Sequence, residues 1–226
     1  MNKLLLALTI TAVVAGAAMS TANAQGATPA SKREAAAQWS RDGLQPARVS
    51  GLDLVYIRPG ADLSGYRKVM VHPVPVTFRP AWQQRVSRPG STRILERDLD
   101  RIRGELGSVV GEQVARELAR SGYMIVDQAG ADVLEVDVRV SDLYLNAPDF
   151  PEAGIRHSYT SSFGELTIIG ELRDGATGQT LMQVLDRTRG RDLGILQLTT
   201  RVENANEVAI AANAWARSVR RELAAR

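Results

Sequence analysis

The sequence predicts a single α+β domain, in which a mixed, mostly antiparallel sheet carries two long helices packed on one face. Two segments, residues 92–120 and 204–225, have the apolar spacing of amphipathic helices. Four segments between them have the alternation or turn signals of strands. Two helices are too few to alternate with every strand, which argues for a mixed sheet with both helices on one face. The four strands form adjacent hairpin-like pairs, so we expect them to be antiparallel.

The start of the chain has the features of a secretory signal peptide. Lys3 makes it positive, residues 4–19 form an uncharged apolar run, and Ala22 and Ala24 flank a pattern that signal peptidase cuts after. The run is shorter than a membrane span, which needs about 20 residues. We therefore expect cleavage after Ala24. The chain has no cysteine to carry a lipid, so no lipid anchor is expected. The mature protein is expected to be periplasmic, with no transmembrane span.

Composition divides the chain into three regions. Residues 1–24 are the signal peptide, residues 25–50 are expected to be a flexible arm or linker, and residues 51–226 are the α+β domain. The arm is rich in Ala, Ser, Gly, Pro and charged residues, a composition that buries little apolar surface. Trp39 and Leu44 are its candidate anchors to the domain.

The first strands of the domain are expected at residues 52–57 and 66–78. The second alternates well but contains Pro73 and Pro75, which cannot donate to a ladder. It is therefore either an edge strand or a strand bent in the middle. Residues 79–91 have the prolines and glycines of a loop.

The first long helix is expected over residues 92–120, with Thr92 as its N-cap. Its apolar stripe winds around the helix, and Gly104, Gly107 and Gly111 fall where the stripe turns. These glycines indicate either a kink or a place where another backbone approaches closely. The kink is the preferred interpretation.

After this helix, strands and loops alternate up to the last helix. A short buried strand is expected first, followed by an alternating strand, a long loop, a hairpin, a second loop and the helix. Their expected ranges, in this order, are 123–126, 132–145, 146–162, 165–187, 188–197 and 204–225.

The charge balance argues against a nucleic-acid partner. The chain has 28 basic and 25 acidic residues, and loss of Lys3 with the signal peptide leaves 27 against 25. Most of the basic residues are arginines spread along the chain, which is more typical of overall composition than of a binding surface. An exported domain this close to neutral is not expected to bind nucleic acid.

The sequence lacks catalytic motifs. It contains neither a G-x-S-x-G elbow nor a glycine-rich phosphate loop. Its two histidines, His72 and His157, do not have the spacing of zinc ligands, and thiol chemistry is excluded without cysteine. We expect no cofactor, no metal and no enzymatic activity. The alternative is a periplasmic hydrolase that uses His157 with a serine or carboxylate nucleophile.

Two arginine-rich segments are the candidate binding residues. One surrounds Trp82 and the other follows the hairpin. The arginines are Arg79, Arg85, Arg88, Arg187, Arg189 and Arg191. An aromatic ring among arginines can hold an anionic or sugar ligand by stacking and forked hydrogen bonds. We hypothesise that residues 79–88 are the contact segment; the alternative is solvated loops, with Trp82 tucked onto the domain edge.

Several motifs carry a resemblance to a known family. They are Asp42-Gly43-Leu44, Tyr56-x-Arg58-Pro59-Gly60-Ala61-Asp62-Leu63-x-x-Tyr66, Val74-x-Val76-x-Phe78, Gly122-Tyr123-x-Ile125-Val126-Asp127, Ala131-Asp132-Val133-Leu134 and Asp174-x-x-Thr177-Gly178-x-x-Leu181. In order and spacing they resemble a domain-of-unknown-function family of Gram-negative bacterial proteins that are described as envelope lipoproteins. The resemblance covers most of residues 42–226 and brings no assigned catalytic residue. This chain departs from the pattern by lacking the lipidated cysteine.

The order of strands and helix is also similar to that of small periplasmic accessory domains of envelope assembly machines, which bind other proteins. These resemblances imply an exported, non-enzymatic accessory or binding protein. Its expected partner is another envelope protein or an envelope polymer.

Overall fold

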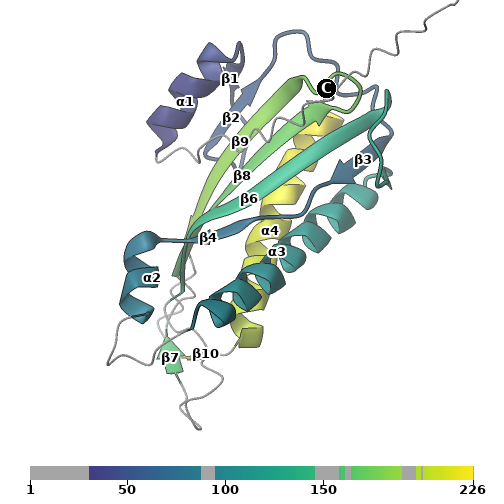
Figure 1. Cartoon of the computed structure of the whole chain (residues 1–226). Helices are drawn as coiled ribbons and strands as arrows, with labels where there is room; N and C mark the ends of the chain where they lie inside the picture. Colours follow the sequence, from purple (N-terminus) through teal and green to yellow (C-terminus); the bar gives the residue numbers. More distant parts are fainter. Residues whose placement is uncertain are drawn as a thin grey trace, which may run out of the picture.

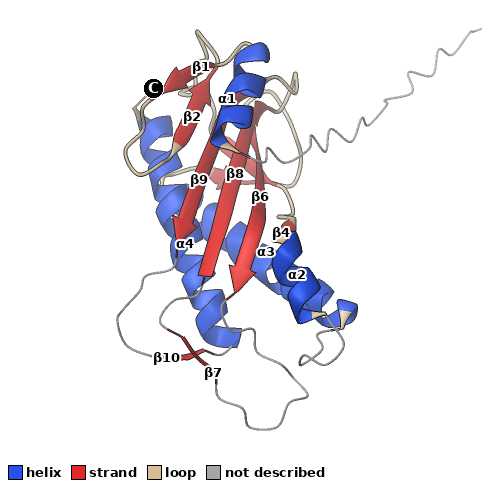
Figure 2. Ribbon diagram, turned by 90° about the vertical axis from the view of Figure 1, so that its left-hand side faces the viewer, coloured by secondary structure: helices blue, strands red, loops and turns tan. Residues whose placement is uncertain are grey.

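The computed structural model describes residues 31–87, 95–145, 158–160, 164–189, 197–199 and 201–225. Figure 1 shows an open sheet with two long helices, α3 (Glu96–Ala119) and α4 (Arg201–Ala224), along one face. Figure 2 shows the same layers from the side, with α1 (Lys32–Arg41) in front of the strands. The α+β class with two long helices on one face is therefore confirmed. No helix of the described ranges combines the length and the hydropathy that a membrane span needs.

The main sheet has eight strands within the described residues, and its pairing is mixed. Its strands are β1 (Gln45–Ala47), β2 (Leu54–Ile57), β3 (Lys68–Val71), β4 (Val76–Phe78), β5 (Met124–Ile125), β6 (Val133–Leu145), β8 (Gly164–Asp174) and β9 (Thr180–Arg189). Their order is β1-β2-β9-β8-β6-β3-β5, and β4 also pairs with β6. The pairs β1–β2, β2–β9, β9–β8 and β8–β6 are antiparallel. The pairs β6–β3, β3–β5 and β4–β6 are parallel. A separate antiparallel pair joins β7 (Ser158–Thr160) to β10 (Gln197–Thr199).

The central strand and the hairpin lie where the sequence periodicity predicts them. Along β6, Leu134, Val136 and Val138 are at most 2% exposed, and they belong to the core that α3 and α4 cover. β8 and β9 pair along their length as an antiparallel hairpin. Alternation identifies β6, because its neighbouring side chains point to opposite faces of the sheet. The hairpin is recognised by its turn residues instead, since β8 and β9 also bury Ile169 and Leu185 on the second face.

Two prolines divide the segment predicted as one strand over residues 66–78. β3 and β4 are its two halves, and both run parallel to β6. Between them, the carbonyl oxygen of Pro75 accepts a hydrogen bond from the N–H of Val140 at 2.9 Å. The bent strand, one of the two predicted alternatives, is the one that the structure adopts.

The glycines of α3 allow a close approach. α3 is one continuous helix, and a Cβ at Gly107 would lie 2.4 Å from the carbonyl oxygen of Val74. Any residue larger than glycine would therefore push the helix away from the bent strand. Gly104 faces open space. The preferred kink interpretation gives way to its alternative, in which a glycine admits another backbone.

The segment expected to be a flexible arm is folded onto the sheet from Ser31 onward. Ser31 caps α1 by accepting a hydrogen bond from the Glu34 N–H at 3.2 Å. Trp39 is 3% exposed and meets Tyr56 edge-on, with 5.6 Å between the ring centroids. The arm prediction is wrong for this part because a short helix is stabilised by packing rather than by its composition.

Residues 80–86 form a helix, α2 (Pro80–Val86), where the sequence predicts a loop. Pro80 suits the first turn of a helix, because its missing N–H has no partner there anyway. Trp82 and Val86 lie one turn apart and both are buried. Two apolar residues are too few to show a helical period, so the sequence pattern missed this element. Residues 88–94, with the predicted N-cap Thr92, lie outside the described residues.

β5 is an exposed edge rather than the buried strand that was predicted. Met124 is 61% exposed and Ile125 41%. The strand pairs in parallel with β3, which separates it from β6, so the expected antiparallel pair of these two strands does not form. Apolar residues in a short strand suggest burial, but the last strand of a sheet has only one neighbour to cover it.

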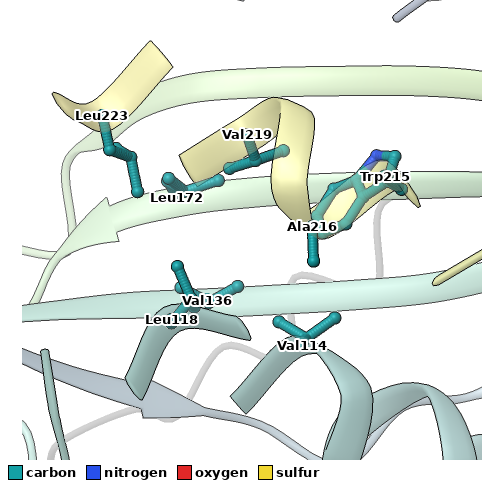
Figure 3. Close-up of a pocket in the computed structure, with 8 residues that line it drawn as sticks. All are labelled: Val114, Leu118, Val136, Leu172, Trp215, Ala216, Val219 and Leu223. Carbon is teal, nitrogen blue, oxygen red and sulfur yellow. The ribbon is translucent and has the colours of Figure 1, made fainter. Parts of the chain in front are cut away.

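An apolar crevice lies between α3, α4 and the sheet (Figure 3). Its lining residues are Val114, Leu118, Val136, Leu172, Trp215, Ala216, Val219 and Leu223. The crevice is too narrow to hold a water molecule. Beside it, Trp215 packs so tightly on Gly170 that an added Cβ there would lie 2.3 Å from the ring. The crevice is therefore part of the core.

Candidate functional site

The candidate site lies at the end of the sheet where β6 and β9 finish, β8 begins and α2 packs. Its charged residues come from both arginine-rich segments of the sequence. We call them the arginine cluster: Arg79, Arg85, Arg187 and Arg189. Figure 2 shows α2 beside the end of β6, at the opposite end of the sheet from α1.

A β-bulge in β6 turns Tyr144 toward this site. The register with β8 shifts between Ser141 and Tyr144, and Asp142 has a φ of 54°, a left-handed conformation that aspartate tolerates. Leu143 and Leu145, after the bulge, are buried in the core. Because neighbouring side chains of a strand alternate, Tyr144 points to the face opposite α3 and α4.

Two arginines stack on the Tyr144 ring. The guanidinium carbons of Arg79 and Arg85 lie 5.5 Å and 5.3 Å from its centroid, within the range of a cation–π contact. Arg85 also donates a hydrogen bond from Nη2 to the Tyr144 hydroxyl at 3.2 Å. These contacts fix the directions of both guanidinium groups.

Glu165 joins the two arginine-rich segments. It pairs with Tyr144 across the β6–β8 ladder, and its Oε2 accepts a hydrogen bond from Arg79 at 2.8 Å. Its Oε1 lies 3.5 Å from the Nε of Arg187 and 3.7 Å from that of Arg189. Three guanidinium groups therefore surround one carboxylate, and the fourth, that of Arg85, lies over the ring of Tyr144.

The carboxyl group of Glu165 is held in its charged form. The hydrogen bond from Arg79 lowers its pKa; burial opposes this effect, and the charges of Arg79, Arg187 and Arg189 add to it. The four arginines and Glu165 together carry three excess positive charges. This arrangement can attract and hold an anion.

Trp82, the predicted centre of the contact segment, is a core residue. It is 1% exposed, stacks on Phe78 with 4.7 Å between ring centroids, and donates its indole N–H to the carbonyl oxygen of Leu145 at 2.7 Å. The contact hypothesis is corrected for Trp82 in favour of its alternative, a ring tucked against the domain, because a ring that is covered on all sides has no surface for a partner. Its role is to fasten α2, which carries Arg85 and begins directly after Arg79.

The other predicted site residues fall into two groups: those that lie together in the arginine cluster and those outside the described residues. The structure brings Arg79 and Arg85 together with Arg187 and Arg189. Arg88, Arg191 and the alternative catalytic residue His157 lie outside the described residues. The sequence-based reading missed Tyr144 and Glu165, since only the fold shows that both face the arginines.

A second polar group involves β3, β6 and β8. His72 Nε2 lies 3.3 Å from Glu135 Oε2, and potential ligand atoms of His72, Glu135 and Asp137 all lie within 4.8 Å of one another. Arg173 Nη2, however, lies 3.1 Å from Glu135 and 2.5 Å from Asp137. Because Arg173 already pairs with both carboxylates, we interpret this group as an ion-pair network.

Together these observations define a class of protein: an α+β domain with a surface arginine cluster built around one carboxylate. The chain belongs to the DUF3313 family, described as a protein of unknown function, whose model matches residues 33–219. The resemblance to a domain-of-unknown-function family is thus confirmed. No curated protein shows significant sequence similarity to the chain.

Several solved structures are similar to the chain. A PelC dodecamer from Paraburkholderia phytofirmans is 12% identical, with a TM-score of 0.35 over 71% of this chain and 94% of that one. A minor lipoprotein from Acinetobacter baumannii is 12% identical, with a TM-score of 0.34 over the same shares. A DUF4136 family protein from Bacteroides thetaiotaomicron is 8% identical, with a TM-score of 0.35 over 80% and 97%.

Proposed function

We propose that this chain is a non-enzymatic accessory protein of the bacterial cell envelope that binds an anionic group of its partner at the arginine cluster. One observation carries the proposal. Arg79 and Arg85 are separated from Arg187 and Arg189 by about a hundred residues of sequence, yet the two pairs meet: Arg79 and Arg85 lie over Tyr144, and Arg79 shares Glu165 with Arg187 and Arg189. Arginine donates bidentate hydrogen bonds to anionic oxygens and is frequent among the residues that dominate interface energies.

The chemistry of the cluster favours binding over catalysis. A general base needs a free, correctly placed acceptor with a pKa near the working pH. The pKa of Glu165 is instead lowered, and its carboxylate is bound by Arg79. Arginine stays protonated at every physiological pH, so the cluster offers fixed positive charge and hydrogen-bond donors.

The envelope location in this proposal rests on the N-terminal sequence. The positive start, the apolar run and the site after Ala24 are those of a secretory signal peptide. Intact-mass measurement of protein from the periplasmic fraction should show a chain that begins at Gln25 and carries no lipid. Retention of residues 1–24 in the membrane fraction would contradict export in this form.

The binding proposal is tested by crosslinking in intact cells and capture of the tagged protein. Replacing Arg187 and Arg189 together by Gln should abolish capture of the partner. The matched control replaces Arg33 and Arg41, two exposed arginines of α1, and should leave capture unchanged. If both double variants capture the partner as well as the natural chain does, the arginine cluster is not the binding surface.

A further inference from the structure

We infer that the group bound by the arginine cluster is a phosphomonoester, a doubly charged anion, rather than a carboxylate or a phosphodiester. This inference rests on the proposed function and specifies its ligand. Three features of the cluster support it: its open hydrogen-bond donors, its charge and the spacing of two arginines.

The donors of Arg187 and Arg189 are open as far as the described residues show. Their Nε atoms lie 3.5 Å and 3.7 Å from Glu165 Oε1, whereas a charge-assisted hydrogen bond measures about 2.7–2.9 Å. Glu165 therefore attracts both guanidinium groups by its charge but does not occupy all of their hydrogen-bond donors. The further contact of Arg187 is a long one, 3.5 Å from its Nε to Thr167 Oγ1. Within the described residues, the terminal amino groups of both arginines have no acceptor.

The charge of the cluster matches a dianion. Glu165 stays ionised, as its lowered pKa indicates, so it repels any incoming anion. A carboxylate or a phosphodiester has about one charge to set against that repulsion, whereas a phosphomonoester has about 1.5 to 2 near neutral pH. Asp53 also interacts with the charge of Arg187. With both carboxylates counted, the four arginines still leave two excess positive charges, which favours the group with the higher charge.

The spacing of the two open arginines suits a group with three terminal oxygens. Arg187 and Arg189 are two residues apart on β9, so their side chains leave the same face with Cα atoms about 6.6 Å apart. A phosphomonoester has three terminal oxygens and can accept from two guanidinium groups at once. A carboxylate has two oxygens in one plane, which a single guanidinium fork satisfies.

Calorimetric titration of the mature chain tests the inference with three small probes. Glucose 6-phosphate is the monoester, dimethyl phosphate the diester and glucuronate the carboxylate. Near pH 7.5 the monoester should bind about tenfold more tightly than either of the others. Equal or tighter binding of glucuronate or of the diester would overturn the inference.

Variants and pH show whether the cluster is responsible. Replacing Arg187 and Arg189 by Gln should weaken glucose 6-phosphate binding about tenfold or more, and the Arg33 and Arg41 double variant should bind as the natural chain does. Lowering the pH to about 5.5 should weaken monoester binding, because its second pKa is about 6, while glucuronate binding stays constant. Binding that ignores both the substitution and the pH would refute the assignment.

Vesicles distinguish the two sources of such a group. Phosphatidic acid is a phosphomonoester lipid and phosphatidylglycerol a phosphodiester, each mixed into phosphatidylcholine. Co-sedimentation with phosphatidic acid alone places the group on a lipid, and binding of the sugar phosphate without co-sedimentation places it on a glycan. Equal co-sedimentation with both anionic lipids would overturn the monoester assignment. If partner capture still depends on the arginines in that case, the proposed binding function stands and only the ligand class is wrong.

Discussion

Trp82 shows how one buried side chain can position charged residues that lie on the surface. Its ring packs on Phe78, and its indole N–H is bound to the carbonyl oxygen of Leu145. This fastens α2 to the last residue of β6. Arg79 and Arg85 lie on either side of Trp82 in the sequence, so they are held at Tyr144 by a residue that touches no ligand.

Trp82→Ala should therefore lower the free energy of unfolding by about 3–5 kcal/mol, because it removes a fully buried aromatic ring. Trp82→Phe keeps most of the packing but leaves the Leu145 carbonyl without its donor, which costs about 1–3 kcal/mol. Urea denaturation measures both. A melting temperature of Trp82→Ala within a few degrees of the natural chain would mean that the ring is not part of the core.

Asp186 and Asp53 are expected to affect stability in opposite directions. Burial raises the pKa of Asp186, and the charge of Asp53 raises it further. The folded state then binds more protons than the unfolded state, between the ordinary carboxyl pKa and the raised value, so stability falls as pH rises through that window. At neutral pH the negative charge of Asp186 therefore lowers the free energy of unfolding. Asp186→Asn should raise the free energy of unfolding at pH 7, and this gain should disappear at pH values below the ordinary carboxyl pKa.

Asp53 is the matched control for this substitution. Burial acts to raise its pKa, but the hydrogen bond from Lys32 and the other contacts outweigh burial and lower it. Its charge therefore contributes stability above the ordinary carboxyl pKa, and this contribution is lost as pH falls through the lowered value. Asp53→Asn should destabilise the protein at pH 7. Urea denaturation at several pH values that gives the same sign for both variants would contradict the assignment.

At the scale of elements, α3 offers a paired test of glycine. Gly104→Ala should raise the free energy of unfolding by up to about 1 kcal/mol, because alanine is the better helix former and its methyl group meets open space. Gly107→Ala should lower it, because the new Cβ would lie 2.4 Å from the Val74 carbonyl oxygen. Chemical denaturation distinguishes the two. An equal gain from both substitutions would mean that α3 does not pack this closely.

The elements that the sequence predicted correctly are those with a long regular period. β6, α3 and α4 each have a long apolar period that can be recognised locally, and the β8–β9 hairpin is marked by its turn residues. The approach of Gly107 to Val74 depends on two residues more than thirty positions apart, and no local pattern contains it. The bulge at Asp142 is equally invisible, although it decides which way Tyr144 points.

The same limit applies to the candidate site. Each arginine-rich segment is visible in the sequence, and the residue types suggested an anion. Their meeting depends on the sheet order, which places β8 between β6 and β9 and so puts Glu165 next to both segments. For Trp82 the sequence left both a contact role and a tucked ring open, because an aromatic residue among charges carries no local sign of burial.

At the scale of the whole molecule, the two faces of the sheet are covered unequally. α3 and α4 cover one face along its length, whereas α1 covers the other at one end (Figure 2). The cluster under α1 is small and consists of Ala35, Trp39, Leu44, Tyr56, Ile169 and Leu185. An ion pair at 2.7 Å between Lys32 and Asp53 also ties this helix to the sheet.

Deleting residues 25–50 should therefore destabilise the rest of the domain. The deletion removes the buried side chains of Trp39 and Leu44, whose burial is worth about 3–6 kcal/mol together, and it exposes the apolar residues beneath them. We expect a lower melting temperature, stronger binding of a hydrophobic dye and a tendency to aggregate. Trp39→Ala in the full chain should produce most of the loss in stability, which separates packing from chain length. If the shortened chain melts at the same temperature as the full one, residues 25–50 are the flexible arm that their composition suggests.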